Sequence, residues 1–299
     1  MTTRSRGPLA GFGWLARGIS VGFRHPKPLF GGAAFLVLAC LLPSLITMPM
    51  QFHTINAGTQ LSPATFGLIM AVSVLVGLLI VPLYAGYLQV VDAAERGLPA
   101  RARDIFMPYR QGEAWRLIGF GLAVMVVYIA LFGIIVAATG GGIASWYMQV
   151  FTAQANHQPP PTALPDGFGI TMALFLVLGV LMMGFYAISL GQVALRHRSV
   201  FGAIGDGMVG VLKNLLPLLV FAVSAILAWI AVGIVIALVA LLLTLLGKLA
   251  GIWLLVLIIP LYIAMLLIMF AVMFGMMYHL WRDVCGDDTV TGMAPALAA

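Results

Sequence analysis

The fold is decided by residues 215–246, which read LLPLLVFAVSAILAWIAVGIVIALVALLLTLL and contain no Asp, Glu, Lys or Arg. A helix rises about 1.5 Å per residue, so about 20 apolar residues cross the hydrocarbon core of a bilayer, which is about 30 Å thick. This stretch exceeds that length. It therefore predicts a transmembrane helix that is tilted or extends beyond the bilayer.

Five other apolar stretches pass the same test: Pro28–Met50, Thr65–Val91, Trp115–Thr139, Phe168–Leu195 and Ile252–Trp281. The composition agrees, because 63% of the 299 residues are hydrophobic and 8% are charged. A soluble domain carries about 25% charged residues. We therefore expect an all-α integral membrane protein with six transmembrane helices. Residues 1–27 form a cytoplasmic N-terminus, residues 28–281 the membrane domain and residues 282–299 a flexible cytoplasmic tail.

Lys and Arg predict the orientation, because positively charged loops stay on the cytoplasmic side. Five precede the first span, five follow the second, three follow the fourth and one follows the sixth, which makes 14 of the 15 on one side. Only Lys248 is left on the other. We expect three hairpins with both termini in the cytoplasm of a bacterium. The clustered charge fits the anionic inner face of its inner membrane, and nucleic acid is not an expected partner.

The connections on the other side of the membrane, residues 51–64, 140–167 and 247–251, are almost uncharged. The middle one contains Pro159, Pro160 and Pro161, which favour extended backbone, and Trp146 suits a membrane interface. It predicts a surface loop, with a substrate-facing lid as the alternative. The last connection predicts a tight turn.

A weak internal repeat organises the cytoplasmic side, because a short segment of apolar and basic residues precedes each odd-numbered span. In the first segment, one helical face holds apolar residues and the opposite face holds Arg17, Ser20 and Arg24. The third segment has the same pattern, while the second is broken by Pro108. Each predicts a helix that lies flat in the membrane interface. The apolar faces consist of Phe12, Ala16, Ile19 and Phe23 in the first segment and of Phe201, Ile204, Met208 and Leu212 in the third.

Short motifs in the first two segments carry a resemblance to known families. They are Trp14, Phe23-Arg24 and Pro26 before the first span, and Asp104-Ile105-Phe106 with Tyr109-Arg110 before the third. On these motifs the chain resembles uncharacterised families of bacterial multi-pass inner-membrane proteins, built of three repeats of amphipathic helix plus hairpin. It is also distantly similar to the membrane domain of glycerophosphodiester phosphodiesterases. The resemblance implies an inner-membrane location and no established activity.

The spans contain essentially no ionisable side chains, although such side chains mark proton relays and ion paths in membrane proteins. No His-Glu-x-x-His helix of a metalloprotease is present, and the five histidines are scattered along the chain. We therefore expect no catalytic residues, no metal, no cofactor and no enzymatic activity.

Two groups of polar residues are candidate contact sites. The basic residues Arg17, Arg24, Arg101, Arg103 and Lys213 are candidates for contact with lipid headgroups or a partner. A second group lies at the cytoplasmic ends of the second and sixth spans, where Asp92 and Arg96 have the i,i+4 spacing of a surface ion pair. This group is a candidate cytoplasmic vestibule, and its members are Gln89, Asp92, Glu95, His279 and Asp283.

Three functions are compatible with these features. The first is a non-enzymatic membrane protein that binds membrane lipids, a membrane protein partner or both, through its basic cytoplasmic helices. The second is a permease for an apolar or amphiphilic solute, with a path between spans kinked at Pro82 and Pro260. The third is immunity to a membrane-targeted toxin.

Overall fold

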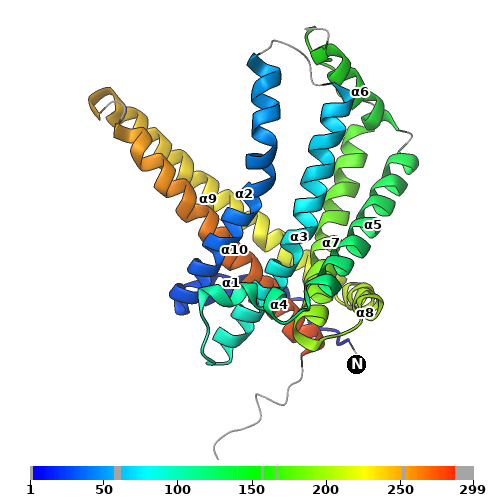
Figure 1. Ribbon diagram of the computed structural model, residues 1–299, viewed down its shortest axis with the longest axis vertical. Coiled ribbons are helices and arrows are strands. Elements are labelled where there is room, and N and C mark those ends of the chain that lie inside the picture. The colour runs from blue at the N-terminus through cyan, green and yellow to red at the C-terminus, as the bar shows by residue number, and fades with distance from the viewer. Residues whose placement is uncertain are drawn as a thin grey trace, which may run out of the picture.

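Six long helices dominate the structure, which is a computed structural model (Figure 1). Each is long and apolar enough to cross a membrane, which confirms the prediction of an all-helical membrane protein with six candidate spans. They are α2 (Pro26–Asn56), α3 (Pro63–Glu95), α5 (Ala114–Ala138), α7 (Phe168–Arg196), α9 (Leu215–Ala250) and α10 (Trp253–Cys285). The structure describes residues 3–56, 62–139, 141–155, 158–165, 167–250 and 253–286.

Shorter helices precede three of these six. They are α1 (Ala10–Arg24) before α2, η1 (Ala102–Phe106) and α4 (Met107–Arg110) before α5, and α8 (Val200–Lys213) before α9. The middle segment is the least regular of the three. Proline is tolerated only in the first turn of a helix, so α4 begins at Met107, just before Pro108, and the residues before it form the separate helix η1. Helices therefore stand where the three sequence repeats predict them.

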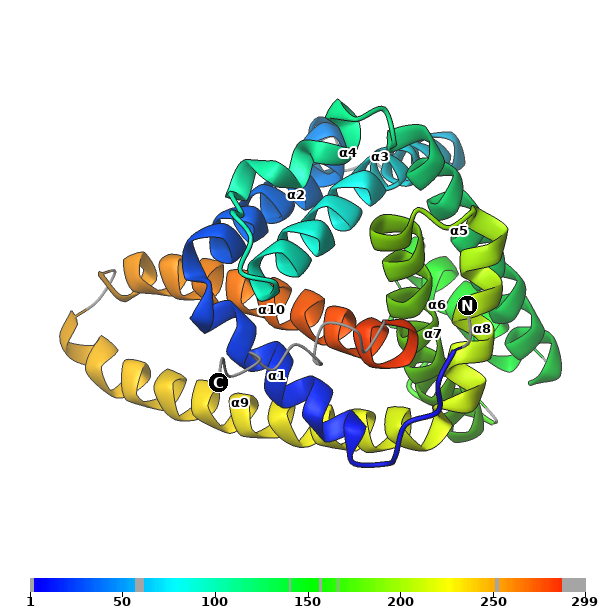
Figure 2. The same cartoon turned by 90° about the horizontal axis from the view of Figure 1, so that it is seen from below.

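The long helices converge at one end of the molecule and splay apart at the other (Figure 1). The converging end carries α1, η1, α4 and α8, and we call it the basal end. The N-terminal residues and the last turn of α10 lie at the basal end too (Figures 1 and 2). Both described chain ends are thus on the same side of the bundle.

Several boundaries differ from the prediction. Residues 142–155 form helix α6 (Gly142–Ala155) within the expected loop, because the first proline comes only at position 159 and leaves the preceding amides able to donate. Helix α9 continues to Ala250, so the turn predicted at 247–251 is mostly helical. Helix α10 continues to Cys285, four residues into the expected tail. Residues 287–299 of that tail lie outside the described residues.

Glycines bring α1 very close to α9 and α10. A Cβ atom at Gly18 would lie 2.3 Å from Cγ and 2.7 Å from the backbone nitrogen of Met276. A Cβ atom at Gly11 would lie 2.0 Å from the carbonyl oxygen of Pro217. Trp14 and Val21, on the same face of α1, are fully buried. Helix α1 therefore bridges α9 and α10, which contact each other much less than each contacts α1.

The core of the protein lies toward the basal end and is rich in aromatic side chains. Trp14, Tyr87, Phe120 and Trp281 are almost fully buried. The Tyr87 hydroxyl donates a hydrogen bond to the Leu29 carbonyl at 2.9 Å and joins α3 to α2. Buried hydroxyl groups need such partners, so this bond allows a tyrosine inside the bundle.

Large apolar side chains cover the outside of the long and short helices. Phe12 and Phe23 on α1 are each 60% exposed, and Phe201 on α8 is 84% exposed. Only 6% of the apolar stretch of α9 is buried inside the protein. So much exposed apolar surface is incompatible with water as the only solvent, and it suits contact with lipid.

Candidate functional site

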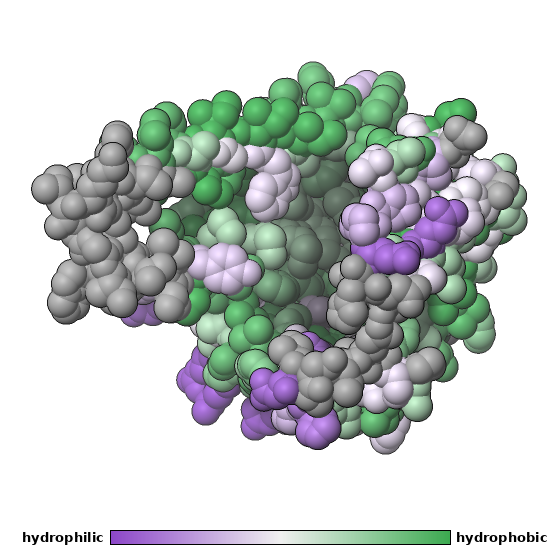
Figure 3. All heavy atoms as spheres, turned by 90° about the horizontal axis from the view of Figure 1, so that it is seen from above, coloured by the Kyte–Doolittle hydropathy of each residue, from purple (hydrophilic) through white to green (hydrophobic). Residues whose placement is uncertain are grey.

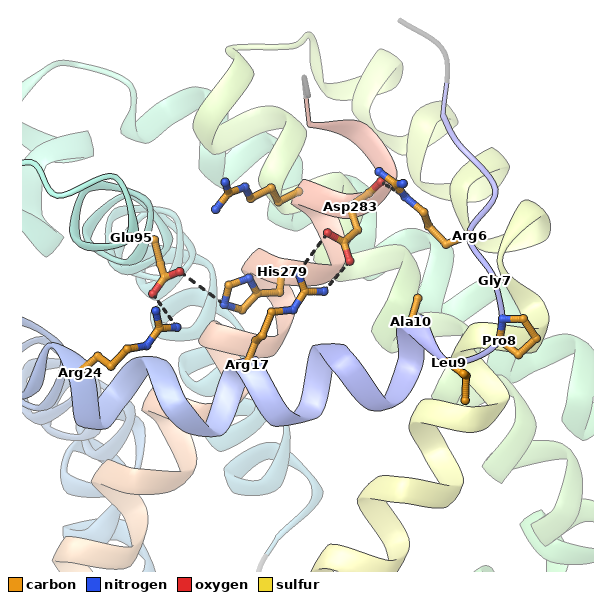
Figure 4. A pocket seen from close by; sticks show the side chains of 11 residues that line it. Arg6, Gly7, Pro8, Leu9, Ala10, Arg17, Arg24, Glu95, His279 and Asp283 are labelled. Atoms are coloured by element: carbon orange, nitrogen blue, oxygen red, sulfur yellow. Dashed lines mark hydrogen bonds and ion pairs between the residues drawn. The ribbon is translucent and has the colours of Figure 1, made fainter. Parts of the chain in front are cut away.

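A cleft of about 750 Å³ opens at the basal end, where α1, the N-terminal residues and the ends of α3 and α10 meet (Figure 4). We call it the arginine cleft. The described residues that line it include four guanidinium groups and two carboxylates, a formal charge of +2 from these side chains when His279 is neutral. Its lining residues are Arg6, Gly7, Pro8, Leu9, Ala10, Arg17, Arg24, Glu95, His279, Arg282 and Asp283.

Asp283 joins the last turn of α10 to α1. Its Oδ2 accepts a hydrogen bond from Trp14 Nε1 at 2.8 Å and from Arg17 Nη2 at 2.5 Å, and its Oδ1 accepts from Arg17 Nη1 at 3.3 Å. This two-point pairing fits the planar fork of a guanidinium group. Asp283 therefore fixes the Arg17 side chain at the edge of the cleft while satisfying the only N–H donor of a buried tryptophan ring.

Glu95 lies at the inner wall of the arginine cleft, with a side chain only 7% exposed. Its Oε1 is 3.2 Å from Arg24 Nη2 and 4.0 Å from His25 Nε2. Its Oε2 is 3.8 Å from His279 Nε2, as Figure 4 shows. Three charged or titratable groups from α1, the α1–α2 junction and α10 thus surround one buried carboxylate.

His279 faces the cleft without a hydrogen bond of its own. The residue is 2% exposed, and neither ring nitrogen has a hydrogen-bond partner among the residues that the structure describes. The 3.8 Å separation from Glu95 is longer than a hydrogen bond. A buried polar group without a partner is costly, so His279 offers a donor or an acceptor to a molecule in the cleft.

The N-terminal segment, residues 3–9, forms the outer wall of the cleft. Its backbone is held by Asn214, whose Oδ1 accepts from Arg6 N at 2.8 Å and whose Nδ2 donates to the Arg4 carbonyl at 2.9 Å. Lys213 Nζ donates to the Thr3 carbonyl at 3.1 Å, and Arg6 Nε donates to the Asp283 carbonyl at 2.7 Å. The junction of α8 and α9 therefore positions Arg6 at the cleft.

Replacing Asn214 by alanine is expected to release the N-terminal segment. The substitution removes the bonds to Arg4 and Arg6 together with the bond from Nδ2 to the Gly210 carbonyl, and each orphaned partner costs about 1–3 kcal/mol when buried. Amide hydrogen exchange in residues 4–9 should become faster. Ser5→Ala is the control, because it removes only an exposed bond to the Lys213 carbonyl. Equal exchange in the two variants would contradict this role of Asn214.

The structure brings part of the expected vestibule together. Glu95, His279 and Asp283 line the same cleft, whereas Gln89 and Asp92 are not among its lining residues. Gln89 Nε2 donates instead to the Ala194 carbonyl on α7 at 3.0 Å. Asp92 forms the predicted ion pair, 2.8 Å from Arg96. Partial burial lowers the pKa of Arg96, but the charge and the hydrogen bond of Asp92, together with Tyr278, hold that pKa above its ordinary value.

The five basic candidates fall into two sets. Arg17 and Arg24 line the arginine cleft, and Lys213 fastens its outer wall. Arg101 and Arg103 are exposed beside η1 and are not among the lining residues. Phe106 and Tyr109, which follow them within eight positions of the sequence, are also exposed.

Sequence reasoning missed four contributors to the site: Arg6, Trp14, His25 and Arg282. One signal was available for the last, because His279, Arg282 and Asp283 have the i, i+3, i+4 spacing of one helical face. No comparable signal in the sequence marks Arg6 and Trp14, because each contacts a residue more than two hundred positions away.

The arrangement can bind an anion with several oxygen atoms, because guanidinium groups recognise phosphate and carboxylate with paired hydrogen bonds. Among the described residues, no three His, Cys, Asp or Glu side chains are grouped closely enough to hold a metal ion. No protein-family model, curated protein or solved structure matches the chain.

Proposed function

We propose that this is a non-enzymatic, multi-pass protein of the bacterial inner membrane that binds an anionic lipid, with the headgroup phosphate in the arginine cleft. The observation that carries the proposal is the cleft itself, where Arg24 and Arg282 lie beside a buried His279 whose ring has no hydrogen-bond partner among the described residues. A phosphate group would fit among these side chains. Its oxygens can accept from guanidinium groups and exchange a hydrogen bond with His279.

In this proposal the basal end faces the cytoplasm and the spans form three hairpins, each headed by a helix lying in the interface. The exposed Phe12 and Phe23 on α1 and Phe201 on α8 support it, because aromatic side chains prefer the boundary between headgroups and acyl chains. The basic residues of the basal end then meet the anionic inner leaflet. Arg101 and Arg103 add general attraction to the anionic membrane surface, while the arginine cleft adds selectivity for the lipid headgroup.

The test compares two double variants of equal charge change. Arg24→Gln with Arg282→Gln removes two guanidinium groups from the cleft, and Arg101→Gln with Arg103→Gln removes two from the exposed surface beside η1. Retained phosphatidylglycerol is measured by native mass spectrometry after extraction from mixed phosphatidylglycerol and phosphatidylcholine nanodiscs. We expect at least a tenfold loss in the cleft variant, because even one lost hydrogen bond to a charged group costs about 1.5–3 kcal/mol and about 1.4 kcal/mol is a factor of ten.

The surface variant should retain lipid within about threefold of the original protein, because exposed charges contribute only about a few tenths of a kcal/mol each. Arg24→Lys with Arg282→Lys should bind more lipid than the glutamine variant and less than the original protein, since lysine keeps the charge and loses the paired geometry of the guanidinium group. Equal losses in the two glutamine variants would show that binding depends on overall charge alone and would overturn the proposal.

A second function, a permease for an apolar or amphiphilic solute, is favoured by one observation. Seen from the splayed end, the protein is hollowed between its long helices, and hydrophobic side chains line the depth of the hollow (Figure 3). Pro82 and Pro260 lie inside α3 and α10. Accelerated movement of a fluorescent lipid between the leaflets of liposomes containing the protein would support this function, and an unchanged rate would count against it.

A further inference from the structure

A second cavity lies on the other side of α1 from the arginine cleft. It is an apolar groove of about 420 Å³ between α9 and α10, within the range of about 300–1,000 Å³ typical of ligand pockets. We call it the methionine groove. Its lining residues are Leu15, Ile19, Phe23, Ala225, Ala228, Trp229, Val232, Met265, Ile268, Met269, Val272, Met273 and Met276.

Helix α10 connects the groove to the cleft. Its groove-lining residues end at Met276, and its cleft-lining residues begin three positions later at His279 and continue to Asp283. Spacings of three and four place all of them along one stripe of the helix. This stripe is apolar over its first part and ionic over its last, and from Met265 to Asp283 it rises about 27 Å at 1.5 Å per residue.

Helix α1 connects the same two cavities at its C-terminal end. Phe23 lines the methionine groove and Arg24, the next residue, lines the arginine cleft. Their Cα atoms are separated by about 3.8 Å. The last turn of α1 therefore carries an apolar wall on one side and a cationic wall on the other, which are the two chemistries that an acyl chain and its headgroup require.

We infer that the methionine groove holds an acyl chain of the phospholipid whose phosphate occupies the arginine cleft, so the two cavities form one site that meets at Phe23 and Arg24. The inference rests on the proposed function. Methionine side chains suit this occupant because they are flexible and polarizable and adapt to chains of different shape. The small direct contact between α9 and α10 leaves the space that the chain fills.

The test fills the groove without touching the cleft. Ala228→Trp places a large ring among the lining residues of α9, and Leu227→Trp places the same ring one position away, on an exposed residue that does not line the groove. Two probes are compared by native mass spectrometry: dioleoyl phosphatidylglycerol, with long chains, and dihexanoyl phosphatidylglycerol, with short ones. Both carry the same headgroup.

We expect Ala228→Trp to lower retention of the long-chain lipid about tenfold, because each excluded methylene group loses its burial, and to leave short-chain binding unchanged. Leu227→Trp should leave the retention of both lipids unchanged. Short-chain binding by Ala228→Trp also shows that the variant is folded. Val232→Trp lies one helical turn farther from the basal end, about 5.4 Å along α9, so it should tolerate longer chains than Ala228→Trp does.

Two results would overturn the inference in distinguishable ways. If Ala228→Trp and Leu227→Trp retain the long-chain lipid equally while the cleft variant at Arg24 and Arg282 loses both probes, the groove holds no chain and the headgroup site stands. If the original protein retains neither probe, the headgroup site and the acyl-chain site both fail.

Discussion

A single methyl group added at Gly18 is expected to detach α1 from α10. In Gly18→Ala the new Cβ would lie 2.3 Å from Met276 Cγ and 2.7 Å from the Met276 backbone nitrogen, so the helices themselves must move apart. Overpacking costs about 1–3 kcal/mol when side chains can adjust, and we expect at least the upper value here because backbone must shift. Thermal unfolding in detergent, followed by tryptophan fluorescence, measures the change, since the buried Trp14 lies on the same helix.

Gly13→Ala is the matched control, because it makes the same substitution on the same helix. The nearest atom to its new Cβ is Arg17 Nη2 at 3.8 Å, an ordinary contact. Alanine also favours a helix over glycine by up to about 1 kcal/mol. This variant should be as stable as the original protein or slightly more stable. Similar unfolding temperatures for both variants would mean that α1 and α10 are not in close contact.

The second large effect is expected when Asp283 is replaced by alanine. The fully buried Trp14 ring loses the acceptor of its Nε1–H group, and leaving such a donor without a partner costs about 1–3 kcal/mol. Arg17 loses its carboxylate at the same time. The free energy of unfolding should therefore fall, whereas retention of phosphatidylglycerol should rise, because the cleft gains one unit of positive charge and a released guanidinium group.

Glu113→Gln provides the comparison for Asp283. Glu113 also pairs with an arginine, Arg116, at 2.5 Å, but within one helical turn and at the surface. Surface pairs contribute about 1 kcal/mol or less, so neither stability nor lipid retention should change measurably. If Asp283→Ala were as mild, the carboxylate would not be needed to hold α1 on α10. If it lowered lipid retention, Arg17 would need its carboxylate to contribute to binding.

The long helices could be predicted from the sequence because each depends on a property of one continuous stretch. Residues 215–246 exceed the thickness of a bilayer, and the structure extends this helix only to Ala250. The ends of the long helices were harder to predict, because a helix can continue beyond the apolar stretch that predicts it. Helix α10 remains helical through Arg282 and Asp283, where its composition has already become polar.

The candidate site was only partly predictable, because it combines local spacing with distant packing. Glu95 and His279 could be grouped because both lie near the ends of spans, and the distribution of Lys and Arg predicts that these ends share one side of the membrane. The approach of Arg17 to Asp283 depends on the close packing of Gly18 against α10, which no pattern within α1 alone reveals. Gln89 was grouped with Glu95 by proximity in sequence, yet it faces α7.

The bridge that α1 makes between α9 and α10 has a consequence for biosynthesis. Trp14 and Asp283 are 269 positions apart, so α1 leaves the ribosome long before α10 and cannot complete its packing until α10 has been made. Contacts between such distant residues are slow to form because a long loop must close first. During synthesis the apolar and glycine-rich face of α1 needs an interim partner, and the membrane surface is the one at hand. Closure of α1 onto α10 at the basal end is then a late step of folding, and truncation before Met276 removes the part of α10 on which Gly18 packs.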